Sequence, residues 1–271
     1  MTMDELIDTV EELHLPMDGT YMNVIRFGRG KKAFVLLSGV SLCGLEGAGK
    51  GVAAAYADYA EDYTVYLFDR KKVLPVGYTV EDMAEDVYRA LETLDVHEAD
   101  VYGVSQGGMM ALSLALRHPE LVRALALCST QARAGAIMKN TTREWQRLCA
   151  LQDTAALNRH FIEKVYSPAY RARYSDAFRA MEQTGTAEDC ARFAVLARAC
   201  ELFDVYDQLP RIHCPALILA DVNDQIISYE SSLEIKEALG CECHLYDEYS
   251  HAVFDETPDV RQRVLAFMRR V

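Results

Sequence analysis

A serine flanked by glycines is the residue of this sequence best suited to do chemistry. Ser105 is the centre of the pattern G-x-S-x-G at residues 103–107, where an apolar run ends and a helical pattern begins. This pattern is typical of a tight strand-to-helix turn that holds a serine in strained backbone. Glycines suit the positions two residues to either side, because side chains there would collide with the neighbouring strand and helix. Ser105 is therefore the predicted nucleophile.

Two residues near the C-terminus have the types that a serine nucleophile needs. A serine hydroxyl is weakly nucleophilic, so it requires a base within hydrogen-bonding reach and a third group that orients the base. His251 follows the last expected strand, and Asp224 follows the apolar run of residues 215–220, where a parallel sheet presents its functional loops. We predict His251 as the base and Asp224 as the acid. Asp221 is the alternative acid, since an aspartate such as Asp224 also commonly closes a turn.

The residues around these groups alternate between strand and helix patterns. Apolar segments with the composition of strands occur at residues 21–27, 33–37, 64–68, 101–104, 122–128, 216–220 and 243–246. Helical patterns lie between them, one capped by Thr79 and the last begun by Thr257 and Pro258. We interpret residues 3–13 as a short amphipathic helix. The alternation predicts the α/β class, with a mostly parallel sheet and helices on both faces.

A helical insertion divides the expected α/β core. The strand signal disappears over residues 131–208, and helical patterns replace it around residues 145–151, 155–165, 172–181 and 187–203. We predict a lid over residues 131–208, inserted between core segments 1–130 and 209–271. The lid carries 11 basic and 10 acidic residues, so nearly all of the net charge of −13 belongs to the core.

Several segments together resemble the α/β-hydrolase superfamily over residues 21–271. The serine pattern continues as Gln-Gly-Gly-Met at residues 106–109. Residues 116–122 look like the family's link from the helix after the nucleophile into the next strand, and residues 209–215 look like the return from the lid to the sheet. The resemblance implies a lidded serine hydrolase with the predicted serine, histidine and aspartate as its catalytic triad.

The resemblance also implies an oxyanion hole. By position, the backbone N–H groups of Val40 and Gln106 would face the developing oxyanion. The family usually has His-Gly at this loop, whereas this chain has Ser38 followed by Gly39. The exchange removes a residue that braces the loop in the family.

Two other motifs suggest different chemistry. Residues 44–51 match the phosphate-binding pattern G-x-x-x-x-G-K, but Gly51 stands where a serine or threonine would bind Mg²⁺, which disfavours nucleotide binding. We interpret this segment as a wall of the site entrance. Zinc is the second alternative, with candidate ligands at His213, Cys214, Cys241, Cys243 and His244. Their spacing fits no standard site, so we expect neither a metal nor an organic cofactor.

Composition bounds the partners and the compartment. The net charge of −13 and the lack of a basic run argue against nucleic acid. No apolar run has membrane-spanning length, the first residues lack the basic stretch of a signal peptide, and the eight cysteines show no disulfide spacing. We expect a cytoplasmic protein that acts on a small molecule, with no membrane partner. The sequence leaves the oligomeric state open.

The predicted reaction is hydrolysis of a small, mostly apolar ester or thioester through an acyl-enzyme. Amide or C–C bond hydrolysis on the same scaffold is the alternative, as is a small-molecule binder without catalysis. Arginines of the lid provide positive charge that would offset the acidic core near a pocket: Arg143, Arg147, Arg171 and Arg173. The simpler interpretation is that they solvate helix faces. Tyr166, Tyr170 and Tyr174 are interpreted as helix packing.

Overall fold

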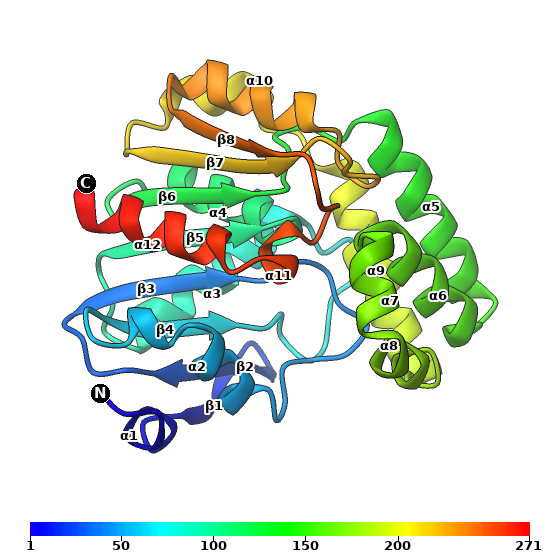
Figure 1. Ribbon diagram of the computed structural model, residues 1–271, viewed down its shortest axis with the longest axis horizontal. Helices are drawn as coiled ribbons and strands as arrows, with labels where there is room; N and C mark the ends of the chain where they lie inside the picture. The colour runs from blue at the N-terminus through cyan, green and yellow to red at the C-terminus, as the bar shows by residue number, and fades with distance from the viewer.

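The apolar segments of the sequence pair into one eight-stranded sheet in the computed structural model, which describes residues 1–271 (Figure 1). The strand order is β1-β2-β4-β3-β5-β6-β7-β8. Strand β2 runs antiparallel to β1 and β4, and every other neighbouring pair is parallel. The strands are β1 (Glu11–Met17), β2 (Thr20–Phe27), β3 (Lys32–Leu37), β4 (Tyr63–Phe68), β5 (Ala99–Val104), β6 (Val122–Cys128), β7 (Ala216–Asp221) and β8 (Glu242–Tyr246).

Helices cover both faces of this sheet, as predicted. Helices α3 (Val80–Thr93), α4 (Gln106–Arg117) and α10 (Tyr229–Leu239) pack on one face, where they share a hydrophobic cluster. Helices α1 (Met3–Ile7), α2 (Gly49–Ala55) and α12 (Asp259–Arg270) share a second cluster on the other face. Figure 1 shows α12 crossing in front of the sheet and α4 behind it. The predicted α/β class with a mostly parallel sheet is confirmed.

The N-terminal expectation is wrong over most of its length. Helix α1 ends at Ile7, and the residues from Glu11 onward form the edge strand β1. In β1, Leu13 and Leu15 turn toward the core and alternate with exposed residues, which is the two-residue period of a half-buried strand. Pairing with β2 decides the outcome, because strand formation depends more on a neighbouring strand than on local propensity. The end of the chain agrees more closely, since α12 begins one residue later than expected, with Pro258 as its N-cap.

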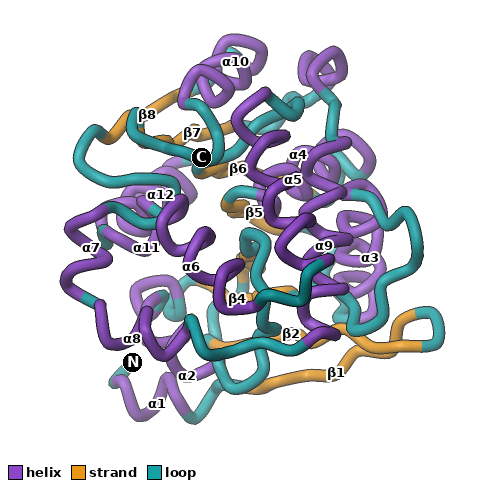
Figure 2. Tube along the Cα trace, turned by 90° about the vertical axis from the view of Figure 1, so that its right-hand side faces the viewer, coloured by secondary structure: helices purple, strands orange, loops and turns teal.

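A block of five helices lies at the carboxyl end of the parallel strands, between β6 and β7 (Figure 1). They are α5 (Ala136–Ala150), α6 (Thr154–Val165), α7 (Pro168–Arg173), α8 (Ser175–Met181) and α9 (Ala187–Leu202). Figure 2 looks onto this end of the molecule, where α5 and α9 pack side by side and α6 to α8 extend to the other side.

The two segments that connect the helical block to the core lie side by side. The chain leaves and returns in an antiparallel bridge, where Ala134 N–H donates to the Phe203 carbonyl at 3.0 Å and Val205 N–H donates to the Ala132 carbonyl at 2.8 Å. Helix α5 starts well before the expected pattern around residue 145, because its first turns bury Met138 and Thr142. No helix in the structure combines the length and the apolar character that crossing a bilayer would require.

Candidate active site

Ser105 occupies a strained turn between β5 and α4. Its backbone angles are φ 53° and ψ −121°, a conformation that residues with a Cβ rarely adopt. A side chain at Gly103 would clash with the backbone of Gly107, and a side chain at Gly107 would clash with the carbonyl oxygen of Leu37 in β3. The steric reason predicted for the two glycines is therefore confirmed.

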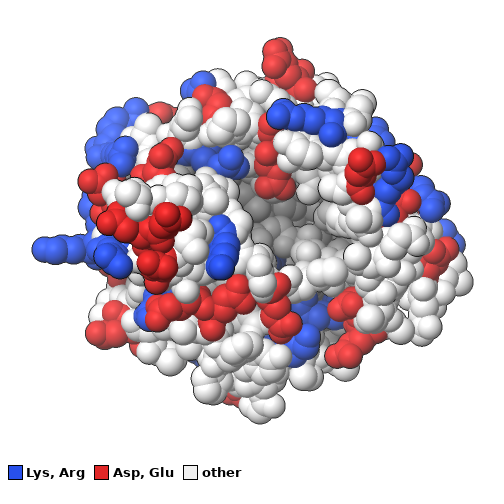
Figure 3. Space-filling view, turned by 60° about the horizontal axis from the view of Figure 1, so that its bottom comes forward, with Lys and Arg blue, Asp and Glu red and all other residues white.

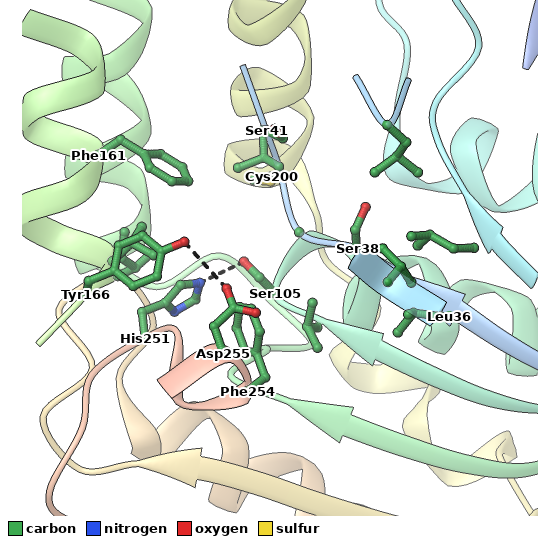
Figure 4. A pocket seen from close by; sticks show the side chains of 18 of the residues that line it. Leu36, Ser38, Ser41, Ser105, Phe161, Tyr166, Cys200, His251, Phe254 and Asp255 are labelled. Atoms are coloured by element: carbon green, nitrogen blue, oxygen red, sulfur yellow. Dashed lines mark hydrogen bonds between the residues drawn. The ribbon is translucent and has the colours of Figure 1, made fainter. Parts of the chain in front are cut away.

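The structure brings Ser105, His251 and Asp224 into one chain of hydrogen bonds. His251 Nε2 lies 2.9 Å from Ser105 Oγ, and His251 Nδ1 lies 2.7 Å from Asp224 Oδ2. The three residues are only 5%, 4% and 8% exposed, respectively. They come from the loops that follow β5, β8 and β7, and Figure 4 shows the histidine ring aimed at the serine hydroxyl. This arrangement can move a proton from the serine oxygen to the imidazole as the oxygen attacks a carbonyl carbon.

Asp224 and Asp221 have different partners, although both follow β7. The second oxygen of Asp224 accepts hydrogen bonds from the backbone N–H groups of Ile226 and Ile227, at 2.8 and 2.9 Å. These bonds fix the carboxylate while its other oxygen receives the histidine. Asp221 instead accepts from the N–H groups of Asn223 and Tyr249, at 2.8 and 2.9 Å. It therefore ties the β7 loop to the β8 loop and makes no contact with the imidazole.

The loop after β3 passes directly against the serine. A Cβ on Gly39 would lie 3.2 Å from the Cβ of Ser105, so a side chain there would be tightly packed against the serine. Val40 follows in the same loop and lines the cavity beside the serine. Gln106 is the first residue of α4. The N–H groups at a helix N-terminus have no partner within the helix and favour nearby negative charge. Val40 and Gln106 therefore both lie beside Ser105.

Arg70 is a part of the site that sequence reasoning missed. Its buried guanidinium donates to Ser38 Oγ at 3.0 Å, to the Ser38 carbonyl at 2.7 Å and to Gln106 Oε1 at 2.8 Å. It thereby joins the loop after β3 to the first residue of α4. The loop that carries Ser38 is thus braced by a side chain from the segment that follows β4. The available signal was a charged Asp-Arg pair at residues 69–70, directly after an apolar strand.

The same network reaches the helical block. Gln106 Nε2 donates to the Leu196 carbonyl at 2.8 Å and contacts Cys200 Sγ at 3.0 Å, both in α9. Arg192, also in α9, forms an ion pair with Asp69 at 3.1 Å. The position of α9 is therefore coupled to the backbone around the serine.

A mostly apolar cavity of about 330 Å³ opens above Ser105 and His251, and 16 of its 22 lining residues are hydrophobic. The core contributes Leu36, Val52, Tyr56, Leu67 and Val104, and the helical block contributes Met138, Trp145, Phe161, Val165, Tyr166 and Met181. Figure 3 shows a hollow in the surface whose inner atoms are mostly uncharged, with charged side chains around its rim. Such a cavity accommodates a small organic molecule.

The arginines of the helical block lie outside this cavity. None of the four is among the lining residues. Arg143 pairs with the buried Glu201 of α9, and Arg147 pairs with Glu144 on the exposed face of α5. The four arginines therefore place no positive charge in the cavity wall, which favours the simpler interpretation.

The three tyrosines divide between packing and the cavity. Tyr170 stacks on Tyr166 with ring centroids 5.5 Å apart and contacts Tyr174 at 4.5 Å, as expected for helix packing. Tyr166 also lines the cavity, and its hydroxyl lies 3.4 Å from Asp255 Oδ2. Its polar end was not anticipated from the sequence.

The phosphate-binding pattern is occupied by the protein itself. The N–H groups of Gly47 and Gly49 donate to the carboxylate of Glu12, at 3.0 and 3.1 Å. A nucleotide phosphate would need these donors, so the side chain from β1 blocks that use. Leu45 and Val52 line the cavity, which agrees with a wall of the entrance. No group of three or more His, Cys, Asp or Glu side chains is arranged to hold a metal ion.

Comparison with known proteins identifies the family of this chain. Residues 54–258 match the family model described as alpha/beta hydrolase fold. The chain belongs to this family. A Rhizobium rhizogenes protein named as a carbamate hydrolase, RutD, is 27% identical over 240 residues, covering 83% of this chain and 90% of that protein.

Two solved structures have the same fold as this chain. MGS-M2, an alpha/beta hydrolase enzyme from a Medee basin deep-sea metagenome library, has a TM-score of 0.86 at 19% identity, over 96% of this chain and 98% of that one. The enol-lactonase from Burkholderia xenovorans LB400 has a TM-score of 0.83 at 20% identity, over 95% and 100% of the two chains. The resemblance inferred from the sequence is confirmed.

Proposed function

We propose that this protein is a serine hydrolase that cleaves a small, mostly apolar ester or thioester through an acyl-enzyme. The observation that carries the proposal is the Ser105 hydroxyl, 2.9 Å from His251 Nε2 and at the floor of an apolar cavity. The strained backbone at Ser105 destabilises the folded protein, and such strain is usually kept where it serves a reaction. A protein that only binds its ligand would not need it. Catalysis therefore accounts for the site better than binding alone.

The first half of the reaction forms the acyl-enzyme. Ser105 Oγ attacks the carbonyl carbon while its proton passes to His251 Nε2, and Asp224 stabilises the resulting imidazolium. The N–H groups of Val40 and Gln106 bind the oxyanion of the tetrahedral intermediate. When the intermediate collapses, the bond to the alcohol or thiol breaks, and His251 returns the proton to the leaving group.

The second half regenerates the enzyme. Water gives a proton to His251 and adds to the acyl carbon. When the second tetrahedral intermediate collapses, the bond between Ser105 Oγ and the acyl carbon breaks, His251 returns the proton to Oγ, and the acid is released. The carbamate and enol-lactone named for the relatives also contain a carbonyl carbon that a serine could attack, so substrates of these classes fit the same steps. Amide and C–C bond hydrolysis remain alternatives because they start with the same groups.

Residues 131–208 act as the lid that selects the substrate. Their side chains form one side of the cavity, including Trp145 and Phe161, while the reacting groups come from the core. A cavity of about 330 Å³ lies at the low end of the range for small-molecule sites, roughly 300–1,000 Å³. Short acyl groups therefore fit, whereas each added methylene must find room in a packed site.

Hydrolysis of p-nitrophenyl esters of increasing chain length tests the proposal. We expect kcat/KM to be higher for the acetate and butyrate than for the octanoate and palmitate. Ser105→Ala should lower kcat by a factor on the order of 10⁴ or more. Ser41→Ala, which changes another serine of the cavity, is the matched control and should retain activity. Ester hydrolysis that persists in Ser105→Ala, or a preference for the palmitate, would contradict the proposal.

A further inference from the structure

Asp255 and His251 are the only charged or titratable Asp, Glu, Lys, Arg or His side chains in the cavity wall. Among the 22 lining residues there is no Lys, Arg or Glu and no other Asp. Asp255 lies in the short helix α11 (Val253–Glu256), one turn after the catalytic histidine candidate. Figure 4 shows its carboxylate beside the Tyr166 hydroxyl, on the side of the cavity where His251 and Ser105 lie. A substrate held over the serine therefore has a carboxylate within its surroundings.

The Asp255 carboxylate has almost no partners within the protein. Its one side-chain hydrogen bond is the long contact of 3.4 Å from the Tyr166 hydroxyl, and it forms no ion pair. The neighbouring Glu256 differs, because its carboxylate accepts the Ser167 N–H at 2.7 Å. Arg261 directs a guanidinium nitrogen to the Phe254 carbonyl at 2.9 Å instead of to Asp255. Both oxygens of Asp255 are thus available to a ligand.

The Asp255 carboxylate is exposed at the mouth of the cavity, and the protein atoms around it shift its pKa. Burial around the cavity raises the pKa of Asp255 to about 6, and the nearby Glu256 raises it further. Arg261, the Tyr166 hydroxyl and His251 act in the opposite direction and keep the pKa from rising more. At neutral pH the group is mostly ionised, and its charge is compensated only at a distance. A ligand that carries a positive charge would form the ion pair that this carboxylate lacks within the protein.

The aromatic rings of the cavity favour the same type of ligand. Phe254 precedes Asp255 in the wall, and Tyr166 and Phe161 face it from the helical block (Figure 4). Aromatic faces attract ammonium groups, and the attraction is stronger where water is excluded. No cationic side chain of the wall competes for these rings. The net charge of −13 also draws cations toward the molecule and repels anions.

We propose that the substrate carries a positively charged nitrogen, which binds between the Asp255 carboxylate and the neighbouring aromatic rings while the scissile carbonyl lies on Ser105. This inference rests on the proposed hydrolase function and narrows its substrate class. The remainder of the substrate is apolar, because the rest of the wall is mostly hydrophobic. Asp255 is a specificity residue in this account, and it takes no part in the bond-breaking steps.

Two pairs of isosteric esters separate the effect of charge from that of shape. The first pair is 2-(trimethylammonio)ethyl butyrate and 3,3-dimethylbutyl butyrate, which differ in the alcohol part. The second pair is ethyl 4-(trimethylammonio)butanoate and ethyl 5,5-dimethylhexanoate, which differ in the acyl part. For at least one pair we expect kcat/KM to favour the cationic ester about 10-fold or more, because a charge pair and contacts with aromatic faces act together.

Matched variants assign the preference to Asp255. In Asp255→Asn the ratio of the two kcat/KM values should fall to about 1, with the neutral ester as the reference within each variant. Glu256→Gln removes the same charge one residue away and should keep the wild-type ratio. No preference in either pair, or a preference that persists in Asp255→Asn, would overturn the inference.

A binding measurement distinguishes this inference from the proposed function. Calorimetry of Ser105→Ala with benzyltrimethylammonium chloride requires no hydrolysis. Saturable binding that is lost in Ser105→Ala/Asp255→Asn supports the cation site even where no ester is cleaved. Ester hydrolysis by the wild-type protein without such binding retains the hydrolase proposal and removes the cation site.

Discussion

At the scale of single residues, His251 is the group through which its two partners act. Its ring is held on one side by Asp224 at 2.7 Å and meets Ser105 on the other at 2.9 Å. The carboxylate fixes the tautomer, with the proton on Nδ1 and the lone pair on Nε2 facing the hydroxyl. An amide in place of the carboxylate would disturb this assignment without removing packing volume.

The first prediction compares the two aspartates after β7. Asp224→Asn should keep the fold and lower kcat by a factor on the order of 10⁴, as in the best-studied triad. Asp221→Asn is the matched control, because it removes the same charge from a neighbouring position that does not contact the histidine. Steady-state kinetics on p-nitrophenyl butyrate, with circular dichroism to check folding, measures both. A large loss in Asp221→Asn alone would show that the acid is assigned incorrectly.

The second prediction uses the raised pKa of Asp255. Folding raises this pKa from its ordinary value of 3.8 to about 6, so the folded state binds the proton more tightly than the unfolded state. The resulting destabilisation is complete above about pH 6 and disappears as the pH falls toward 3.8. Asp255→Asn should therefore raise the melting temperature at pH 7.5 and raise it less at pH 4.5.

The control for this measurement is Asp247→Asn, which removes the same charge from a position outside the cavity. It should not show the pH-dependent gain expected of Asp255→Asn. A lower melting temperature of Asp255→Asn at pH 7.5 would mean that the carboxylate stabilises the folded protein. This would conflict with its description as a group without a cationic partner. Sites of this kind commonly lower stability in exchange for function.

At the scale of elements, the ends of β3, β4 and β5 meet at the site, and Arg70 joins them. Its guanidinium holds both the Ser38 carbonyl and the Gln106 side chain, so it positions the loop and the helix terminus that carry the proposed oxyanion donors. A lysine has one nitrogen and lacks the planar fork that reaches several acceptors together. The third prediction follows from this difference.

Arg70→Lys should lower kcat about 10- to 100-fold and change KM little, which is less than the loss of an oxyanion donor itself. The split between kcat and KM separates a positioning role from general destabilisation. Arg192→Lys is a matched control, because Arg192 pairs with Asp69 and does not bond to Ser38 or Gln106 beside the serine. A raised KM with unchanged kcat in Arg70→Lys would contradict the positioning role.

The strands and the serine turn could be predicted from the sequence because their signals are local. The apolar segment of β6 and the glycines at 103 and 107 each reflect contacts that recur wherever such an element forms. Strand β1 could not be predicted in this way, since its pairing with β2 overrides the local pattern. Arg70 and Asp255 were missed because their roles depend on what the fold places beside them.

At the scale of the whole molecule, the site forms where two parts of the chain meet. The core segments supply the serine, histidine and aspartate, and the helical block supplies one wall of the cavity. The order serine, aspartate, histidine along the chain was readable from the sequence, as was an insertion between β6 and β7. The size of the cavity and the single carboxylate in its wall required the three-dimensional arrangement.

The central claim is that Ser105 is an activated nucleophile in the folded protein. Intact-mass spectrometry after treatment with a fluorophosphonate probe measures this directly. The account predicts one adduct per chain, located by peptide mapping to Ser105, with labelling absent in Ser105→Ala and strongly slowed in Asp224→Asn. No labelling of the folded wild-type protein, or an adduct that persists in Ser105→Ala, would contradict it.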